Sequence, residues 1–188
     1  MFKLFYPCEY VESVFTIDYE KLYNKGYRGL IFDIDNTLVP HGNDSEERVD
    51  ALFSWLHNLG FQTLLLSNND EERVKRFLKN ISSFYICDAQ KPKPENYRKA
   101  VEMLDMKKEE TVFIGDQVFT DILGANLSGL DSILVRFIGY DTETKIGIRR
   151  TVEKLLLKFY SYNKKCQNRL GNIQKRGKSD NAKEEIIL

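Results

Sequence analysis

The chain alternates between short apolar runs and segments with helical periodicity, and this alternation is the feature that most limits its fold. The apolar runs have the length and composition of buried β-strands. They lie at Gly29–Ile34, Phe61–Leu66, Ser83–Cys87, Thr111–Ile114 and Ser132–Val135. Amphipathic helices are predicted at Ser45–Leu59, Asn69–Lys79, Pro94–Leu104, Asp121–Ser128 and Ile146–Tyr160. Because strands that alternate with helices form parallel sheets, we predict an α/β protein whose five-stranded parallel sheet has helices on both faces.

Length and composition set the domain organisation. A chain of 188 residues fits one domain, expected at residues 1–160, followed by a polar basic tail at 161–188 that loses helical periodicity and is expected to be mobile. The 28 basic and 28 acidic residues cancel, which argues against a nucleic-acid partner. Three widely spaced cysteines without CxxC spacing are expected to be free thiols in a reducing compartment. With no leader-like start and no membrane-spanning apolar stretch, we expect a cytoplasmic protein, with peripheral contact at the inner membrane face left open.

Polar residues follow most of the predicted strands at the point where each strand ends. Asp33, Asp35 and Thr37 follow the first, Ser67 and Asn68 the second, Lys91 the third, and Asp116 and Asp121 the fourth. Because side chains alternate along a strand, Asp33 and Asp35 are expected to point the same way. The carboxyl ends of parallel strands meet at one edge of the sheet, where ligands bind. These side chains are therefore predicted to gather there.

Clustered aspartates need a compensating cation. Two carboxylates about 4 Å apart repel by about 4 kcal/mol at an effective dielectric constant near 20. No histidine or cysteine accompanies these aspartates in the motifs, and an all-oxygen ligand set favours a hard ion such as Mg²⁺. The predicted ligands are Asp33, Asp35, Asp116 and Asp121.

Each motif taken alone has a simpler structural explanation. The aspartates of "DIDNT" can cap a turn, "KPKP" can be a stiff exposed connector, and "GDQVFTD" can be a turn followed by a helix cap. What favours a functional site is their order, because an acid pair, a hydroxyl, a lysine and a Gly-Asp pair follow successive strands.

The quoted motifs also resemble a known family. The set "DIDNT", "LLLSN", "KP" and "GDQVFTD" is similar to the four motifs of the haloacid dehalogenase (HAD) superfamily of phosphohydrolases, whose core is Rossmann-like. More narrowly, the stretch from "YPCEYVESVF" to "FDIDNTLVP", together with "GDQVFTDILGANLSG", resembles the YqeG subfamily, whose relatives include the mitochondrial phosphatidylglycerophosphate phosphatase. The resemblance covers Pro7–Tyr140.

The resemblance implies a role for each site residue. Asp33 would be the nucleophile that forms an aspartyl-phosphate, and Asp35 the general acid and then the base. Magnesium would be held by Asp33, Asp35 and Asp116, with Asp121 as an occasional ligand. Thr37, Ser67, Asn68 and Lys91 would bind the substrate phosphate. Lys93 competes with Lys91 for that role, and Lys91 is favoured because Pro94 already marks a helix start.

The spacing of the motifs leaves no room for a separate cap domain. Leu38–Gly60 holds a loop and one helix, and Ser67–Lys91 one helix and one strand. An open site suits a large substrate, and the resemblance favours a lipid head group such as that of phosphatidylglycerophosphate. Two alternatives remain: a phosphatase of a protein or nucleic-acid substrate, and a non-hydrolytic phospho-accepting or binding module. An acid two residues after the acceptor argues against the second alternative, because it would promote hydrolysis.

Overall fold

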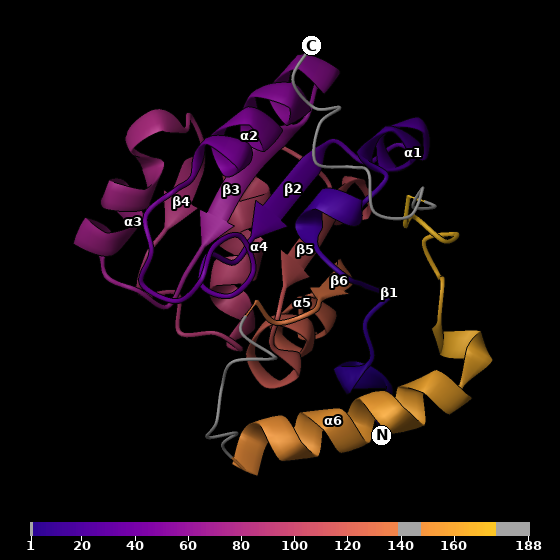
Figure 1. The fold of residues 1–188 in the computed structure, drawn as a ribbon. Helices are drawn as coiled ribbons and strands as arrows, with labels where there is room; N and C mark the ends of the chain where they lie inside the picture. The colour runs from indigo at the N-terminus through magenta and orange to yellow at the C-terminus, as the bar shows by residue number, and fades with distance from the viewer. Residues whose placement is uncertain (1, 139–147, 176–188) are drawn as a thin grey trace.

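A single parallel sheet of six strands forms the centre of the molecule (Figure 1). The computed structural model describes residues 2–138 and 148–175. The strands are β1 (Glu9–Val11), β2 (Gly29–Phe32), β3 (Gln62–Leu66), β4 (Phe84–Ile86), β5 (Thr111–Gly115) and β6 (Asp131–Val135). Their order is β1-β6-β5-β2-β3-β4, and every neighbouring pair is parallel. The parallel α/β fold is confirmed, with six strands where five were predicted.

The additional strand is β1, at the edge of the sheet beside β6. It has three residues, and it carries buried Glu9 and exposed Tyr10, so no apolar run marks it in the sequence. Its pairing with Ile133–Val135 depends on residues more than a hundred positions away. Local sequence patterns do not carry that information.

The sheet reverses its winding direction between β2 and β5. From β2 the chain proceeds outward through β3 and β4, and it then returns to place β5 on the other side of β2. Such a switch point leaves a crevice beyond the carboxyl ends of the two central strands, where α/β proteins bind ligands. Asp33 directly follows β2 and Asp116 directly follows β5, so the two residues stand at this switch point.

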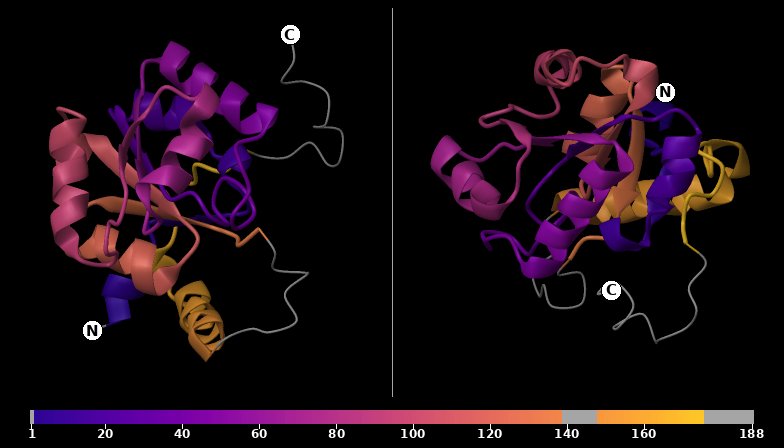
Figure 2. Two further views of the ribbon diagram at one scale, coloured as in Figure 1. Left: turned by 90° about the vertical axis from the view of Figure 1, so that its left-hand side faces the viewer. Right: turned by 90° about the horizontal axis from the view of Figure 1, so that it is seen from above.

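Helices cover both faces of the sheet (Figures 1 and 2). They are α1 (Tyr19–Asn24), α2 (Glu47–Leu59), α3 (Glu71–Phe77), α4 (Pro94–Met103), α5 (Leu123–Leu127) and α6 (Ile148–Tyr162). Alternate strand residues point to opposite faces. Phe32 therefore packs in the cluster that includes Phe53 of α2, whereas its neighbour Ile31 packs in the cluster that includes Tyr97 of α4.

Two helices begin two residues later than predicted. The helix predicted from Ser45 begins at Glu47, and the Ser45 hydroxyl donates to Asp50 Oδ1 at 2.5 Å. Asp70, not Asn69, caps α3 by accepting from the Arg73 amide at 2.8 Å. The helix predicted at Asp121–Ser128 is preceded by a π-helical turn, Val118–Ile122, which leads directly into α5.

No cap domain is inserted between the motifs. The residues between Leu38 and Gly60 form a loop and α2, and those between Ser67 and Lys91 form α3, a short 3-10 turn and β4. This confirms the predicted capless core.

The segment predicted to leave the domain at residue 161 instead packs on it as far as Lys175. Leu170 and Ile173 are buried in the main core, and Gln174 pairs with Ile17 in an antiparallel bridge. Glu9 fastens this segment, because its Oε1 accepts hydrogen bonds from the amides of Leu170 (3.1 Å) and Asn172 (3.0 Å). The remainder of the predicted tail, 176–188, lies outside the described residues. Among the described helices, none has the length and apolar character needed to cross a bilayer.

Candidate active site at the switch point of the sheet

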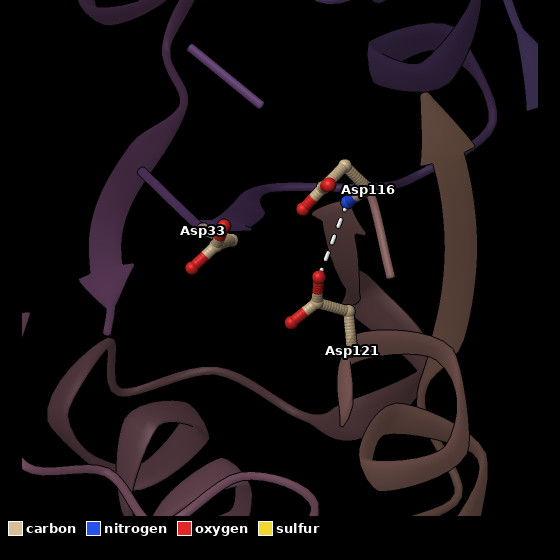
Figure 3. Close-up of side chains that lie close together, drawn as sticks. All are labelled: Asp33, Asp116 and Asp121. Atoms are coloured by element: carbon tan, nitrogen blue, oxygen red, sulfur yellow. Dashed lines mark hydrogen bonds between the residues drawn. The ribbon is translucent and has the colours of Figure 1, made fainter. Parts of the chain in front are cut away.

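Three aspartates from two strand ends converge at the switch point. Asp33 follows β2, Asp116 follows β5, and Asp121 lies in the π-helical turn after β5. Each offers a carboxylate oxygen within 4.8 Å of the others, and all three side chains are buried. Figure 3 shows their carboxylates turned toward a common space. The structure thus brings together three of the four predicted metal ligands.

Gly115 allows Asp121 to come this close to the strand end. A Cβ atom at position 115 would lie 2.6 Å from the Asp121 carboxyl carbon, which is closer than real Cβ contacts come. Asp121 Oδ2 in turn accepts hydrogen bonds from the amides of Asp116 (3.1 Å) and Gln117 (3.0 Å). The glycine of the "GD" pair therefore has a packing reason, and Asp121 holds the turn that presents Asp116.

Lys91 supplies positive charge to the cluster. Its Nζ lies 2.5 Å from Asp33 Oδ1 and 2.8 Å from Asp121 Oδ1, and its side chain is 4% exposed. Burial alone would lower the pKa of Lys91, but the charges of Asp121 and Asp33 outweigh burial and raise the pKa above its usual range. The competing Lys93 is exposed and bonds Gln90 Oε1 at 2.7 Å. The structure therefore brings Lys91 into the site and leaves Lys93 outside it.

The environment of Asp33 makes its carboxylate easier to protonate than that of a free aspartate in the absence of a further cation. Burial raises the pKa of Asp33 to about 6, although the nearby charge of Lys91 opposes the rise and that of Asp121 adds to it. Thr37 supports the same carboxylate by donating from its hydroxyl to Asp33 Oδ2 at 3.3 Å. A carboxylate that gains from added positive charge is what a metal-assisted nucleophile requires.

Asp35 points to a different group of partners from Asp33. β2 ends at Phe32, before Asp33, so the strand alternation expected to align the two side chains does not extend to Asp35. Asp35 Oδ2 accepts from Asn69 Nδ2 at 2.7 Å, and Oδ1 accepts from Arg73 Nη2 at 3.0 Å and from the Gly42 amide at 3.0 Å. Its carboxylate is not part of the three-aspartate cluster.

These contacts set the charge of Asp35. Burial alone would raise the pKa of Asp35, but the hydrogen bonds from Asn69 and Gly42 and the charge of Arg73 outweigh burial and lower the pKa below its usual range. Asp35 is therefore ionised in this arrangement. The pKa values of the two aspartates of the first motif shift in opposite directions because their surroundings differ.

Ser67 and Asn68 lie beside Lys91 at the end of β3. The Ser67 side chain is buried, and its hydroxyl accepts a hydrogen bond from the Asn69 amide at 3.1 Å. Asn68 Oδ1 accepts from the backbone amide of Lys91 at 2.8 Å, which ties the second motif to the third. All the predicted site residues therefore lie after the carboxyl ends of β2, β3, β4 and β5.

Sequence reasoning missed Arg73 and the side chain of Asn69, which together hold Asp35. Arg73 follows the helix cap Asp70 by three residues and looks like an ordinary charge on an exposed helix, yet its side chain is only 10% exposed. It also donates from Nη2 to the backbone oxygen of Asn43 at 2.6 Å. A basic residue in the acidic first turn of α3 is the one signal in the sequence that indicates this role.

A family model and a curated relative both match this chain, and both are hydrolases or phosphatases by description. A family model described as haloacid dehalogenase-like hydrolase matches residues 45–129, a range that contains Ser67, Lys91, Asp116 and Asp121. The chain is 36% identical over 158 residues to "Probable phosphatase YqeG" of Bacillus subtilis, covering 82% of this chain and 91% of that protein.

Two further similarities are weaker. The chain is 29% identical over 166 residues to "Phosphatidylglycerophosphate phosphatase 1, chloroplastic/mitochondrial" of Arabidopsis thaliana, covering 81% of this chain and 47% of that protein. The crystal structure of an uncharacterized protein from Listeria monocytogenes superimposes with a TM-score of 0.50 at 21% identity, over 71% of this chain and 99% of that one. The structural likeness supports the fold.

Proposed function

Because this chain belongs to the haloacid dehalogenase-like hydrolases, in the family of the probable phosphatase YqeG, we propose that it is a magnesium-dependent phosphomonoesterase that works through an aspartyl-phosphate. One observation carries this proposal. The buried carboxylates of Asp33, Asp116 and Asp121 converge at the switch point of the sheet, where the ammonium group of Lys91 contacts those of Asp33 and Asp121. This arrangement combines a nucleophile with the charge needed to accept a phosphate dianion.

The residues of the cluster fit a hard divalent cation. All the donors are carboxylate oxygens, and three carboxylates beside one lysine leave an excess of negative charge. Asp33 and Asp116 would hold the ion, Asp121 would hold it directly or through the turn it stabilises, and Asp35 would contribute its backbone carbonyl. When bound, Mg²⁺ supplies positive charge that draws the phosphate oxygens toward Asp33 and stabilises charge in the transition state.

In the first step, an oxygen of Asp33 attacks the phosphorus of the substrate. A bond forms between that oxygen and phosphorus, the bond from phosphorus to the leaving alkoxide oxygen breaks, and the electron pair stays on that oxygen. Asp35 would give this oxygen a proton. This role requires Asp35 to carry a proton when substrate is bound, whereas in the structure Arg73 and Asn69 hold it ionised.

In the second step, water attacks the phosphorus of the aspartyl-phosphate. Asp35, now ionised, takes a proton from the water, the bond between phosphorus and the Asp33 oxygen breaks, and phosphate leaves. The hydrogen bonds and charge that lower the pKa of Asp35 keep it ionised, which is the state from which it can accept a proton. Two covalent steps replace one very slow hydrolysis.

Four residues would bind the phosphate group during both steps. Lys91 would contribute charge, the hydroxyls of Thr37 and Ser67 would donate hydrogen bonds, and Asn68 would contribute its amide groups. The contacts of Lys91 and Thr37 with Asp33, and the hydrogen bond between Asn68 and the Lys91 amide, support this assignment.

We propose a large or membrane-surface substrate, of which phosphatidylglycerophosphate is the first candidate. The absence of an inserted cap among the described residues leaves nothing to enclose a small metabolite. The similarity to the Arabidopsis phosphatase, whose name specifies this lipid, supports the choice. In this proposal the enzyme acts from the cytoplasm at the inner face of a membrane.

The test is phosphate release from phosphatidylglycerophosphate in mixed micelles and from a soluble aryl phosphate, each with and without Mg²⁺. We expect Mg²⁺-dependent release, faster from the lipid, and its loss in Asp33→Asn. The matched control is Asp105→Asn, because Asp105 is an exposed residue distant from the motifs.

Each of the other results would change the proposal. Release from the aryl phosphate alone would retain the phosphatase and remove the lipid. A stable acyl phosphate without turnover would instead support the phospho-accepting module. Full activity of Asp33→Asn would remove Asp33 from the mechanism.

A further inference from the structure

The outward side of α6 carries a row of exposed apolar side chains. Val152, Leu155, Phe159 and Tyr162 are 41%, 53%, 56% and 75% exposed. Their spacing of three, four and three residues places them along one side of the helix, where they form what we call the α6 stripe. Large apolar side chains grouped on a surface mark a contact with something outside the folded domain.

The α6 stripe is separate from the surface by which α6 packs on the domain. Leu156 is buried with Val118, Ile122 and Leu134, and Tyr160 is buried against Tyr6 with ring centroids 5.6 Å apart. Figures 1 and 2 show α6 lying along one side of the domain, beneath β1 and α5. The helix thus has two apolar sides, and only one of them is used for internal packing.

Exposed lysines flank the stripe. Lys158 stands next to it on the helix, and Lys164 and Lys165 follow directly after its last residue. The one acidic residue of α6, Glu153, is buried and faces the domain. Apolar side chains bordered by lysines are typical of a helix that lies in the interface of a bilayer with anionic lipids.

We propose that the α6 stripe rests on the surface of an anionic lipid bilayer and that Lys158, Lys164 and Lys165 contact the lipid head groups. This inference rests on the proposed function, because an enzyme acting on lipid head groups must meet the bilayer. Charge favours the bilayer over a second copy of this chain. Two facing α6 stripes would bring their lysines together without acidic partners, whereas anionic head groups supply the opposite charge.

A direct connection joins α6 to the proposed active site. Glu153 Oε1 accepts hydrogen bonds from the amides of Val118 (2.9 Å) and Phe119 (3.4 Å), which closely follow Asp116 in the chain. The helix that rests on the bilayer therefore also holds the π-helical turn that carries Asp121 and follows Asp116. Binding through α6 fixes the position of the site relative to the lipid surface.

The experiment measures sedimentation of the full chain with vesicles of phosphatidylcholine and with vesicles in which part of it is replaced by phosphatidylglycerol. We expect binding to the anionic vesicles that weakens as salt is added. The variant Leu155→Gln/Phe159→Gln should lose at least about tenfold in partition coefficient. Its matched control is Phe84→Gln, because Phe84 is 47% exposed on β4 at the opposite edge of the sheet.

A second pair of variants tests the charges. Lys158→Gln/Lys164→Gln/Lys165→Gln should lose binding to anionic vesicles. Lys79→Gln/Lys99→Gln/Lys107→Gln, which removes the same charge from other exposed positions, should lose less. Circular dichroism of each variant shows whether the fold is kept.

Three results would overturn the inference: equal binding to both vesicle types, equal losses in the stripe variant and its control, or a change in the oligomeric state with Leu155→Gln/Phe159→Gln. Hydrolysis of the aryl phosphate in the same samples keeps this test separate from the proposed function. Vesicle binding without hydrolysis supports the bilayer contact and contradicts the enzyme. Hydrolysis without vesicle binding supports the enzyme and contradicts the bilayer contact.

Discussion

Replacing Lys91 by methionine should destabilise the metal-free protein strongly, because the lysine is a buried counter-charge for clustered carboxylates. Its Nζ lies 2.5 Å from Asp33 Oδ1 and 2.8 Å from Asp121 Oδ1, and the three aspartates lie within 4.8 Å of one another. At that separation each pair of carboxylates repels by about 3.5 kcal/mol at an effective dielectric constant near 20. Methionine keeps most of the volume and removes the charge.

The expected loss is about 3–5 kcal/mol in the free energy of unfolding, which is typical for leaving a buried charge without its partner. This loss is a large part of the roughly 5–15 kcal/mol that stabilises a domain. It does not exceed that range, and the variant should therefore still fold. Protonation of the aspartates relieves the repulsion, and the loss should therefore be larger at pH 8 than at pH 6. Mg²⁺ should recover part of it by replacing the missing charge.

The assay is urea unfolding followed by circular dichroism, with and without Mg²⁺. The matched control is Lys93→Met, because Lys93 is exposed and bonds only to Gln90 among the described contacts. The control should change stability by less than about 0.5 kcal/mol. If Lys91→Met unfolds within about 1 kcal/mol of the control at pH 8, Lys91 is not the counter-charge that the geometry implies.

Two further predictions concern the same cluster. Burial raises the pKa of Asp33 to about 6, so the folded protein binds a proton that the unfolded chain releases near pH 4; without Mg²⁺, the free energy of unfolding should fall as pH rises from about 4 to about 6. Denaturant titrations across this range check it, and Asp33→Asn should flatten this part of the profile; an unchanged slope in the variant would assign the proton to another group. Gly115→Ala should weaken Mg²⁺ activation by about tenfold, because the added methyl group would lie 2.6 Å from the Asp121 carboxyl carbon and displace it. Mg²⁺ titration of aryl phosphate hydrolysis measures this effect, and unaltered activation would mean that Asp121 can move without consequence.

The sequence predicted the central part of the fold because the central strands are buried on both faces. Leu30, Ile31 and Phe32 of β2 all have zero exposure, and such strands appear as continuous apolar runs. The edge strand β1 has no such run, because its buried residue Glu9 is charged. Its carboxylate is satisfied by amides near residue 170, and this long-range contact cannot be predicted from local patterns.

The candidate site could be predicted in part for a related reason. Parallel strands place their carboxyl ends together whatever the details of packing, so Asp33, Lys91 and Asp116 could be grouped from the motif order alone. The partners of Asp35 depend on where α3 begins and how it turns toward the first motif. Arg73 and Asn69 therefore became apparent only in the structure.

The switch point also makes the candidate site depend on the pairing of distant strands. Asp33 and Asp116 are separated by 83 positions in the chain, and they meet because β2 pairs with β5 while β3 and β4 lie on the other side of β2. Pairing between such distant segments carries a large loop-closure cost. Metal affinity should therefore report the assembly of the whole domain. A substitution anywhere in the sheet would weaken apparent Mg²⁺ binding, without touching a ligand, once it leaves an appreciable fraction of the chain unfolded.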